Sequence, residues 1–350
     1  MHTTPSPSPR QSISRMAKKV SYPALSVLMP VLNEELYLED AVNSVLGQDY
    51  PGEIELLLSL GPSRDKTLQV ANALAKRDKR VRLIDNPRGL TTVGLNKSIG
   101  QAKFDYVIRV DAHSEPQPNY LQRGIEILLE TGADLLGGVM AAKGKSPFQK
   151  AVAWAYTSRF GIGGAAYHIG GQAGEAESAY LGIFRKSTLL KVGGYDEGVI
   201  RGEDWDLARR IKAAGGLVWF SPELGVTYWP RSRYKDLARQ FYSTGIWRGE
   251  LSRRSLRSAS KRYFIPPLAV LSQVVGLIFL ATGHVIGVVP TAFYLLFVLA
   301  IAISGSALSL RSRIWLVLVL PAMQLCWGYG FWVGILRGAT MASVDKSRIG

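Results

Sequence analysis

The stretch LSVLM at residues 25–29, followed at once by Pro30, is a short apolar run that predicts a buried β-strand. Apolar residues at helical spacing follow over Glu34–Leu46, and the same succession of strand and helix then recurs. Further strands are predicted at Ile54–Leu58, Val81–Ile84 and Tyr106–Val110, and further helices at Thr67–Lys79, Leu95–Ala102 and Tyr120–Glu130. This alternation predicts an α/β fold in which a mostly parallel sheet carries helices on both faces.

Polar residues follow three of these predicted strands. Asn33 comes after the first strand, residues 61–65 come after the second, and residues 111–113 come after the fourth. In open α/β sheets, ligands bind in the crevice beyond the carboxyl ends of the strands. We therefore expect these three loops to form one functional site.

The composition of the whole chain combines two features that are rarely found together. The 350 residues carry a net charge of +15 at pH 7, yet the mean hydropathy is slightly positive at +0.08. Such a chain is either a basic nucleic-acid binder or a membrane protein with a basic cytoplasmic face. Cys326 is the single cysteine, so an intramolecular disulfide framework and a cysteine-based zinc site are excluded.

The basic residues and the apolar stretches lie in different segments of the chain. After Glu250 no acidic residue occurs before Asp345, while basic residues gather just before Ile265. We predict five segments: a disordered basic tail (1–21), the α/β domain (22–247), a basic juxtamembrane segment (248–264), a region with two to three transmembrane or membrane-embedded helices (265–337), and a short tail (338–350).

The membrane region holds three apolar stretches, at residues 265–282, 285–308 and 314–336. Each is near the ~20 residues that a spanning helix needs, and three in succession exceed what the core of a soluble protein uses. The positive-inside rule then places the α/β domain in the cytoplasm of a multi-pass cell-membrane protein. Two spans return Arg311 and Arg313 to the cytoplasm, whereas a third span puts Arg337 outside. The alternative for the last stretch, which contains Gly328, Gly330 and Gly334, is a re-entrant segment or a helix along the interface, so the number of spans stays open.

Two groups of residues are candidates for chemistry. Asp111 and His113 follow the fourth strand with one residue between them, and an oxygen and a nitrogen ligand at this spacing suit Mn²⁺ and, less readily, Mg²⁺. The alternative is an ordinary turn with a capping Asp. Glu203 and Asp204 open an amphipathic helix, where one carboxylate can act as a general base. The alternative there is stabilisation of the helix N-terminus by negative charge.

Several motifs follow one another in a fixed order over residues 26–248: PVLNEE (30–35), GPSRDKT (61–67), residues 89–96, DAH (111–113), GGYDE (193–197) followed by ED (203–204), and residues 240–248. This order resembles that of the family-2 inverting glycosyltransferases with a GT-A fold. Within that family it is most similar to membrane-attached enzymes of the succinoglycan-assembly type. The resemblance implies a Rossmann-like GT-A domain that binds a nucleotide-sugar donor.

The resemblance also implies roles for the matching positions. The residues expected to bind the nucleotide-sugar are Pro30, Asn33, Glu34, Asp65 and Asp111, together with Gln240, Trp247 and Arg248, which resemble a looser form of the Gln-x-x-Arg-Trp motif that closes over the donor. Asp111 and His113 match the Asp-x-Asp metal motif, with Mn²⁺ or Mg²⁺ as the cofactor. Asp204 matches the catalytic base, with Glu203 beside it.

One departure from the family concerns recognition of the nucleotide base. The second strand usually ends in an Asp that contacts the base, but this chain reads Ser59-Leu60-Gly61 there. The base must therefore be recognised by backbone groups or by other residues, and a uridine donor does not follow.

The resulting hypothesis is a single displacement at the sugar with Asp204 as general base. The expected acceptor is a lipid-linked or cell-envelope glycan, and anionic lipids are expected at the basic segment. A Gly- and Ala-rich region at residues 143–181 contains aromatic side chains that either stack on the acceptor sugar or simply pack. The alternatives are a non-catalytic membrane scaffold with the same fold and a nucleic-acid binder; no ordered nucleic-acid motif is visible, and neither nucleic acid nor a disulfide partner is expected.

Overall fold

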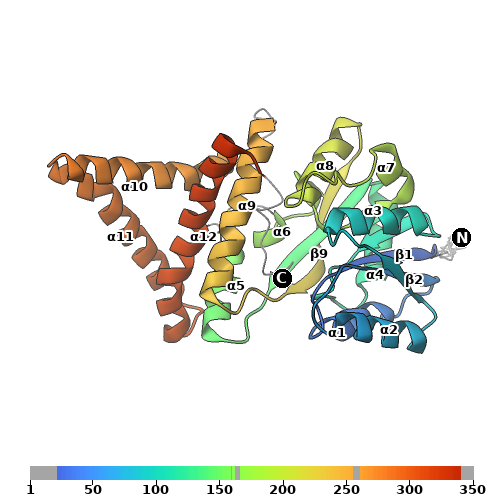
Figure 1. The fold of residues 1–350 in the computed structure, drawn as a ribbon. Helices are drawn as coiled ribbons and strands as arrows, with labels where there is room; N and C mark the ends of the chain where they lie inside the picture. Colours follow the sequence, from blue (N-terminus) through green and yellow to red (C-terminus); the bar gives the residue numbers. More distant parts are fainter. Residues whose placement is uncertain (1–21, 159, 162–165, 255–260, 340–350) are drawn as a thin grey trace, which may run out of the picture.

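The structure is a computed structural model that describes residues 22–158, 160–161, 166–254 and 261–339. The predicted disorder of residues 1–21 lies outside these residues, as do positions 255–260 of the juxtamembrane segment and most of the C-terminal tail. The described chain forms an α/β domain with a helical extension at its C-terminal end (Figure 1).

The strands of the domain form one nine-stranded sheet within the described residues. They are β1 (Leu25–Val31), β2 (Ile54–Leu60), β3 (Val81–Asp85), β4 (Tyr106–Arg109), β5 (Ser114–Pro116), β6 (Leu135–Ala142), β7 (Gly174–Glu175), β8 (Tyr180–Arg185) and β9 (Val218–Tyr228). Their order is β3-β2-β1-β4-β8-β6-β9-β5, with β7 paired to β9. The predicted α/β architecture is confirmed.

The sheet is parallel in its first half and mixed in its second half, where a mostly parallel sheet was expected. β3, β2, β1 and β4 are parallel, but β8 is antiparallel to both β4 and β6. The chain leaves the end of β6 and passes through short helices before β8 without a crossover back to the starting edge. A strand that begins where its neighbour ended must run antiparallel to it.

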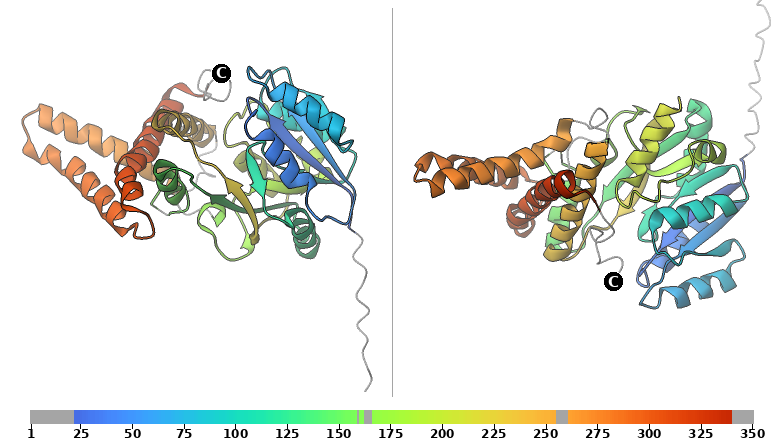
Figure 2. Two further views of the ribbon diagram at one scale, coloured as in Figure 1. Left: turned by 90° about the horizontal axis from the view of Figure 1, so that it is seen from below. Right: turned by 45° about the horizontal axis from the view of Figure 1, so that its top comes forward.

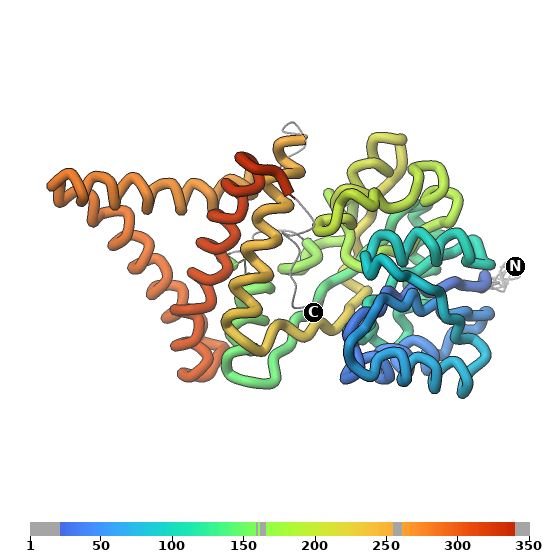
Figure 3. The backbone as a smooth tube through the Cα atoms, viewed as in Figure 1, coloured from blue at the N-terminus to red at the C-terminus, as the bar shows by residue number. Residues whose placement is uncertain are grey.

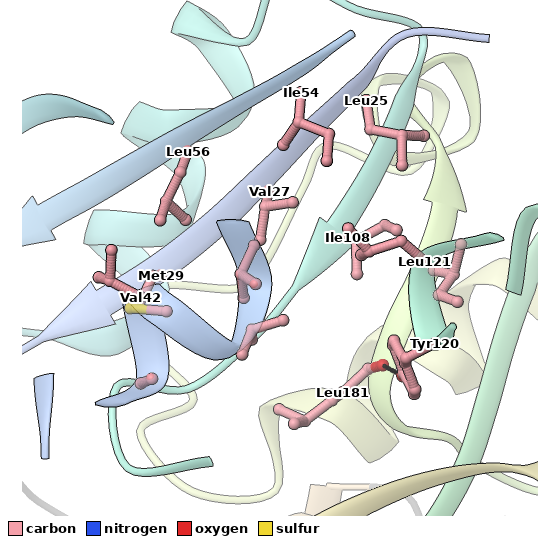
Figure 4. Packing of buried hydrophobic residues seen from close by; sticks show 14 of the residues in the cluster. Leu25, Val27, Met29, Val42, Ile54, Leu56, Ile108, Tyr120, Leu121 and Leu181 are labelled. Atoms are coloured by element: carbon pink, nitrogen blue, oxygen red, sulfur yellow. Dashed lines mark hydrogen bonds between the residues drawn. The ribbon is translucent and has the colours of Figure 1, made fainter. Parts of the chain in front are cut away.

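Helices cover both faces of the sheet, and alternate residues of each strand point to opposite faces. The helices of the domain are α1 (Leu38–Leu46), α2 (Thr67–Arg77), α3 (Thr91–Gln101), α4 (Tyr120–Thr131), α5 (Pro147–Tyr156), α6 (Ala166–Ile169), α7 (Lys186–Lys191), α8 (Glu203–Ala213) and α9 (Tyr234–Arg254). Val27 and Met29 of β1 pack with α1 and α4, as Figure 4 shows, whereas Leu28 packs with α3. The strands are therefore apolar on both sides, which is why they read as continuous apolar runs.

Three apolar helices follow the domain: α10 (Ile265–Ala281), α11 (Val289–Ser304) and α12 (Leu310–Arg337). By length and composition each is able to cross a membrane. α10 and α11 project away from the domain and meet at their far ends, near the short 3-10 helix Val285–Val288, whereas α12 lies alongside α9 (Figures 2 and 3). α9 itself runs without a break through the predicted boundary at residues 247/248.

Candidate active site

A single buried arginine joins the carboxylates of the site. Arg109 is the last residue of β4, and its side chain is only 5% exposed. Its Nε donates to Asp111 Oδ1 at 2.9 Å, its Nη1 donates to Asp204 Oδ1 at 2.6 Å, and both terminal nitrogens lie 3.2 Å from Glu203 Oε1. The sequence motifs assign Arg109 no role. Its position inside an apolar strand pattern was the available signal, because a buried charge needs partners of opposite sign.

Glu203 and Asp204 do not act as helix caps. Gly202 is the N-cap residue of α8, with a φ of 77°, and no side-chain capping bond is formed there. Both carboxylates turn toward the arginine, and their place in the first turn of α8 also puts negative charge at the helix N-terminus, so the two roles are compatible. Their fixed orientation depends on an ion pair with a residue almost one hundred positions earlier in the chain.

The environment of Asp204 makes it a weaker acid than usual. Burial raises the pKa of Asp204 to about 7; Arg109 opposes this increase, while the negative charges of Glu203 and Asp111 add to it. A carboxylate with a pKa near neutrality is a stronger base than an ordinary aspartate, and about half of it is ionised near pH 7. The geometry therefore gives Asp204 the proton affinity that a general base requires.

Asp111 and His113 lie beside each other on the loop after β4, where both face one cavity. Nδ1 of His113 lies 2.8 Å from Glu34 Oε1, so a carboxylate orients the imidazole ring. Metal-binding histidines are commonly held in this way. Glu34 thus lines the cavity and also contacts His113, and this second role does not follow from the sequence motifs.

The residues present suit a metal ion that arrives with a nucleotide. Among the described residues, no group of three or more His, Cys, Asp or Glu side chains is placed to hold an ion by itself. Asp111 and His113 supply one oxygen and one nitrogen ligand, and phosphate oxygens and water commonly complete the shell of Mg²⁺ in nucleotide sites. The donor set therefore fits Mn²⁺ or Mg²⁺ bound together with a diphosphate.

One cavity of about 1070 Å³ contains most of the predicted site. Of the residues predicted from the sequence, it is lined by Pro30, Glu34, Asp111, His113, Glu203, Asp204, Gln240 and Arg248. Gln240 and Arg248 come from α9, and the Arg248 guanidinium stacks on the rings of Trp205 and Tyr263, with ring centroids 4.9 and 4.2 Å away. The segments after β1 and β4, the start of α8 and the distant helix α9 therefore meet at the same site.

Three predicted residues lie outside the lining of this cavity. Asp65 accepts hydrogen bonds from Thr67 and from the backbone N–H of Glu35, so it ties the first loop to the start of α2. Asn33 has a φ of 54° and accepts a bond from the Arg64 N–H. Trp247 is only 3% exposed. These three side chains shape the loops and the helix that carry the site, and their direct contact with the nucleotide stays a prediction.

The aromatic side chains of residues 143–181 are partly at the cavity and partly in the core. Tyr156, Tyr167, His168 and Tyr180 line the cavity, whereas Trp154 packs in the cluster beneath α12. Burial, with a smaller contribution from Arg262, lowers the pKa of His168 to about 3. His168 is therefore neutral at physiological pH and carries no charge with which to attract phosphate.

The cavity also extends to a part of the chain that sequence analysis did not connect with the site. Apolar side chains of all three C-terminal helices line it, among them Leu268 of α10, Phe293 of α11 and Trp327 of α12. One continuous space thus joins the charged cluster around Arg109 to the helices that are able to enter a membrane.

Comparison with known proteins identifies the family. Residues 26–191 match the family model described as glycosyl transferase family 2. Over 314 residues the chain is 31% identical to the succinoglycan biosynthesis protein ExoA of Rhizobium meliloti (strain 1021), an alignment that covers 89% of this chain and 94% of the relative. The chain belongs to glycosyltransferase family 2. The enzyme class and the resemblance seen in the sequence are thereby confirmed.

A further relative and one solved structure each match about nine-tenths of this glycosyltransferase. A Methanococcus voltae enzyme is 23% identical over 331 residues, which are 90% of this chain and 98% of the relative; it is a dolichyl N-acetyl-alpha-D-glucosaminyl phosphate 3-beta-D-2,3-diacetamido-2,3-dideoxy-beta-D-glucuronosyltransferase. The mannosyltransferase PcManGT from Pyrobaculum calidifontis, whose structure holds GDP-Man and Mn²⁺, is 16% identical with a TM-score of 0.62 over 91% of this chain and 89% of its own. The second likeness concerns the fold alone.

Proposed function

We propose that this glycosyltransferase moves a sugar from a nucleotide-sugar to a lipid-linked glycan of polysaccharide assembly, with inversion at the anomeric carbon. The observation that carries the proposal is the continuous cavity, which joins Asp204 to apolar side chains of α10, α11 and α12. A lipid-linked acceptor has a polar glycan and an apolar chain, and this cavity offers a matching surface for each. The name of the Methanococcus voltae relative, which acts on a dolichyl-linked sugar phosphate, supports the same class of acceptor.

In the proposed mechanism, Asp204 takes the proton from the attacking hydroxyl of the acceptor as that oxygen bonds to the anomeric carbon. Arg109 holds Asp204 and Glu203 in place and keeps the cluster from accumulating uncompensated negative charge. Asp111 and His113 would hold a divalent metal, which supplies neutralisation of the charge that develops on the departing diphosphate. Gln240 and Arg248 of α9 face the same cavity and provide further polar contacts for the donor.

We place the catalytic domain on the cytoplasmic side of the cell membrane. The support is the basic segment before α10, in which Arg253 and Arg254 are about half exposed at the end of α9. Basic side chains beside a membrane helix favour the cytoplasmic face and attract anionic lipid headgroups.

A transfer assay with purified protein tests the proposal. The protein is mixed with labelled nucleotide-sugars and with either a polyprenyl-linked saccharide or the same saccharide without lipid. We expect transfer to the lipid-linked acceptor, loss of transfer on chelation with EDTA, and recovery on addition of Mn²⁺ or Mg²⁺.

The outcomes separate the alternatives. Equal transfer to the lipid-free saccharide would show that the apolar part of the cavity does not bind the acceptor. Failure to bind or turn over any nucleotide-sugar would favour the scaffold alternative. Full activity in EDTA would show that transfer needs no divalent metal, and it would not affect the role proposed for Asp204.

The raised pKa of Asp204 predicts the pH dependence of transfer. A general base acts in its ionised form, so protonation below about pH 7 removes the active species. We expect kcat/KM to fall by about tenfold for each pH unit well below 7 and to level off above it. A profile that stays flat down to pH 5 would contradict the assignment of a base with this pKa.

A further inference from the structure

α12 differs from α10 and α11 in what surrounds it. In its most apolar 18 residues, 44% of the positions are buried by the rest of the protein, against 11% in the helix that includes α10 and 22% in the helix that includes α11. Its buried side chains pack against α5 and α9 of the catalytic domain. The cluster includes Leu316, Val319, Leu320 and Met323 of α12 with Phe148, Val152, Leu237 and Phe241 of the domain. The catalytic domain therefore holds α12 along its length.

Glycines on both helices bring α9 and α12 into backbone contact. On each helix two glycines are separated by four positions, and a Cβ on any of them would overlap a backbone carbonyl of the other helix. The overlapping pairs are Gly245 with Trp327, Gly249 with Phe331, Gly330 with Tyr242, and Gly334 with Ile246. Small residues at this spacing permit the closest approach of two helices. The two helices run parallel to each other through this contact. A movement of α12 away from α9 would therefore break the close backbone packing.

α9 has to remain outside the hydrocarbon core of a bilayer. Its middle carries Gln240, Thr244 and Arg248, which line the catalytic cavity. Arg239 near its start and Arg253 near its end are about half exposed. Because α12 runs beside α9, a crossing by α12 would draw these polar and charged groups into the bilayer, where they are costly.

The outer face of α12 is nevertheless apolar. Leu310, Ile314 and Leu318 follow one another at intervals of four residues and are about half exposed or more, and Tyr329 and Leu336 continue the exposed apolar set. α12 spans roughly 42 Å at 1.5 Å per residue, longer than the ~30 Å core of a bilayer. One face of α12 thus packs on protein and the opposite face is suited to lipid, which accounts for a hydropathy that resembles that of a spanning helix.

We infer that α12 lies along the membrane surface on the side that holds the catalytic domain, and that only the α10–α11 hairpin enters the bilayer. This inference rests on the membrane attachment proposed above. Arg311, Arg313 and Arg337 then all stay on the same side as the basic segment, in accordance with the positive-inside rule. The cavity between the three helices opens at the level of the lipid headgroups, where a lipid-linked acceptor presents its glycan.

Cysteine accessibility tests this topology, because Cys326 is the single cysteine of the chain. In full-length protein with Cys326→Ser, new single cysteines are placed before α12 (Ser306→Cys), after α12 (Ala339→Cys) and on the surface of the catalytic domain (Lys79→Cys). A membrane-impermeant maleimide is applied to sealed vesicles of each orientation. We expect all three cysteines to react from the same side. Reaction of the cysteine at position 339 from the opposite side to that at position 306 would overturn the inference.

A depth measurement gives a second, independent readout. A lipid-depth probe is attached on the exposed face in the first half of α12 (Leu318→Cys) or, as the matched control, near the middle of α10 (Leu271→Cys), and each variant is checked for transfer activity to show that it is folded. We expect a headgroup-level position for the α12 probe and a deeper position for the α10 probe. Equal depth for the two would overturn the inference.

Alkaline extraction of the same vesicles distinguishes an error in the position of α12 from an error in the proposed membrane attachment. Protein that stays with the membrane but fails either test above refutes the position of α12 and leaves the proposed function intact. Protein released into the soluble fraction refutes membrane attachment itself, and the inference falls with it.

Discussion

Replacement of Asp204 by Asn is expected to lower the rate of sugar transfer by about 10²–10⁴-fold, the contribution usual for a general base. Asn has the same shape but does not accept the proton of the acceptor hydroxyl at neutral pH. Binding of the nucleotide-sugar should change little, because the expected metal and diphosphate contacts come from Asp111 and His113 on another loop. Single-turnover transfer rates and calorimetric titration of the donor measure the two effects separately.

The neighbouring carboxylate provides the matched control. Glu203→Gln removes a negative charge from the same cluster, but Glu203 shares its bonds to Arg109 and is less exposed than Asp204. We expect a smaller loss of rate for this variant. If Glu203→Gln abolished transfer while Asp204→Asn remained near the wild-type rate, the general base would have to be reassigned to Glu203.

Replacement of Arg109 by Met is expected to have the largest effect on stability. Removal of one partner from a buried ion pair typically costs about 3–5 kcal/mol, because the remaining charges stay buried without compensation. Here Asp111, Glu203 and Asp204 would all lose the same partner. Transfer should be lost as well, since these carboxylates would no longer be held toward the cavity. Chemical denaturation in detergent measures the free energy of unfolding.

The effect of Arg109→Met should depend on pH in a defined direction. Arg109 opposes the rise in the folded-state pKa of Asp204, which already lies above its ordinary value, so loss of the guanidinium raises that pKa further. A group of this kind stabilises the fold below its unfolded-state pKa, and this stability is lost as the pH rises through the folded-state value. We therefore expect the deficit to shrink as the pH is lowered and to be largest above neutrality.

Replacement of a surface arginine serves as the control, because it shows how much stability is lost when any positive charge is removed. Arg80 is about half exposed and pairs with Asp78 at 2.8 Å, so Arg80→Met should cost at most ~1 kcal/mol. Arg109→Lys is also informative, because a lysine keeps the charge but cannot bridge three carboxylates with a planar fork. If Arg109→Met lowered the free energy of unfolding no more than Arg80→Met, the ion pairs of Arg109 would not be what stabilises the site.

Much of the fold was predictable because its elements are encoded locally. The strands at residues 25–31 and 54–60 are buried on both faces, so their apolar runs could be recognised from the local sequence alone. The parallel half of the sheet followed from the alternation of strands and helices. The antiparallel insertion of β8 did not follow, because it depends on which side of the sheet α5 and α6 occupy.

The candidate site was predictable only as a set of loops. Asp111, His113, Glu203 and Asp204 were selected from their chemistry and order, and the structure brings all four to one cavity. Asp65 and Trp247 were selected in the same way, yet their side chains support the scaffold and do not line that cavity. Residue type and spacing do not reveal whether a polar side chain faces a ligand or a neighbouring loop.

The sequence by itself determined three features of this protein. They are an α/β domain, acidic and histidine side chains at strand ends, and three stretches apolar enough to enter a membrane. Only the tertiary structure decided that Arg109 organises the carboxylates across almost one hundred residues, and that α12 packs along α9. The physical reason is the same in both cases. The periodicity of a sequence shows how apolar one face of a helix or strand is. Whether that face packs on protein or on lipid, and which partner a buried charge binds, depends on contacts between segments that are remote in sequence.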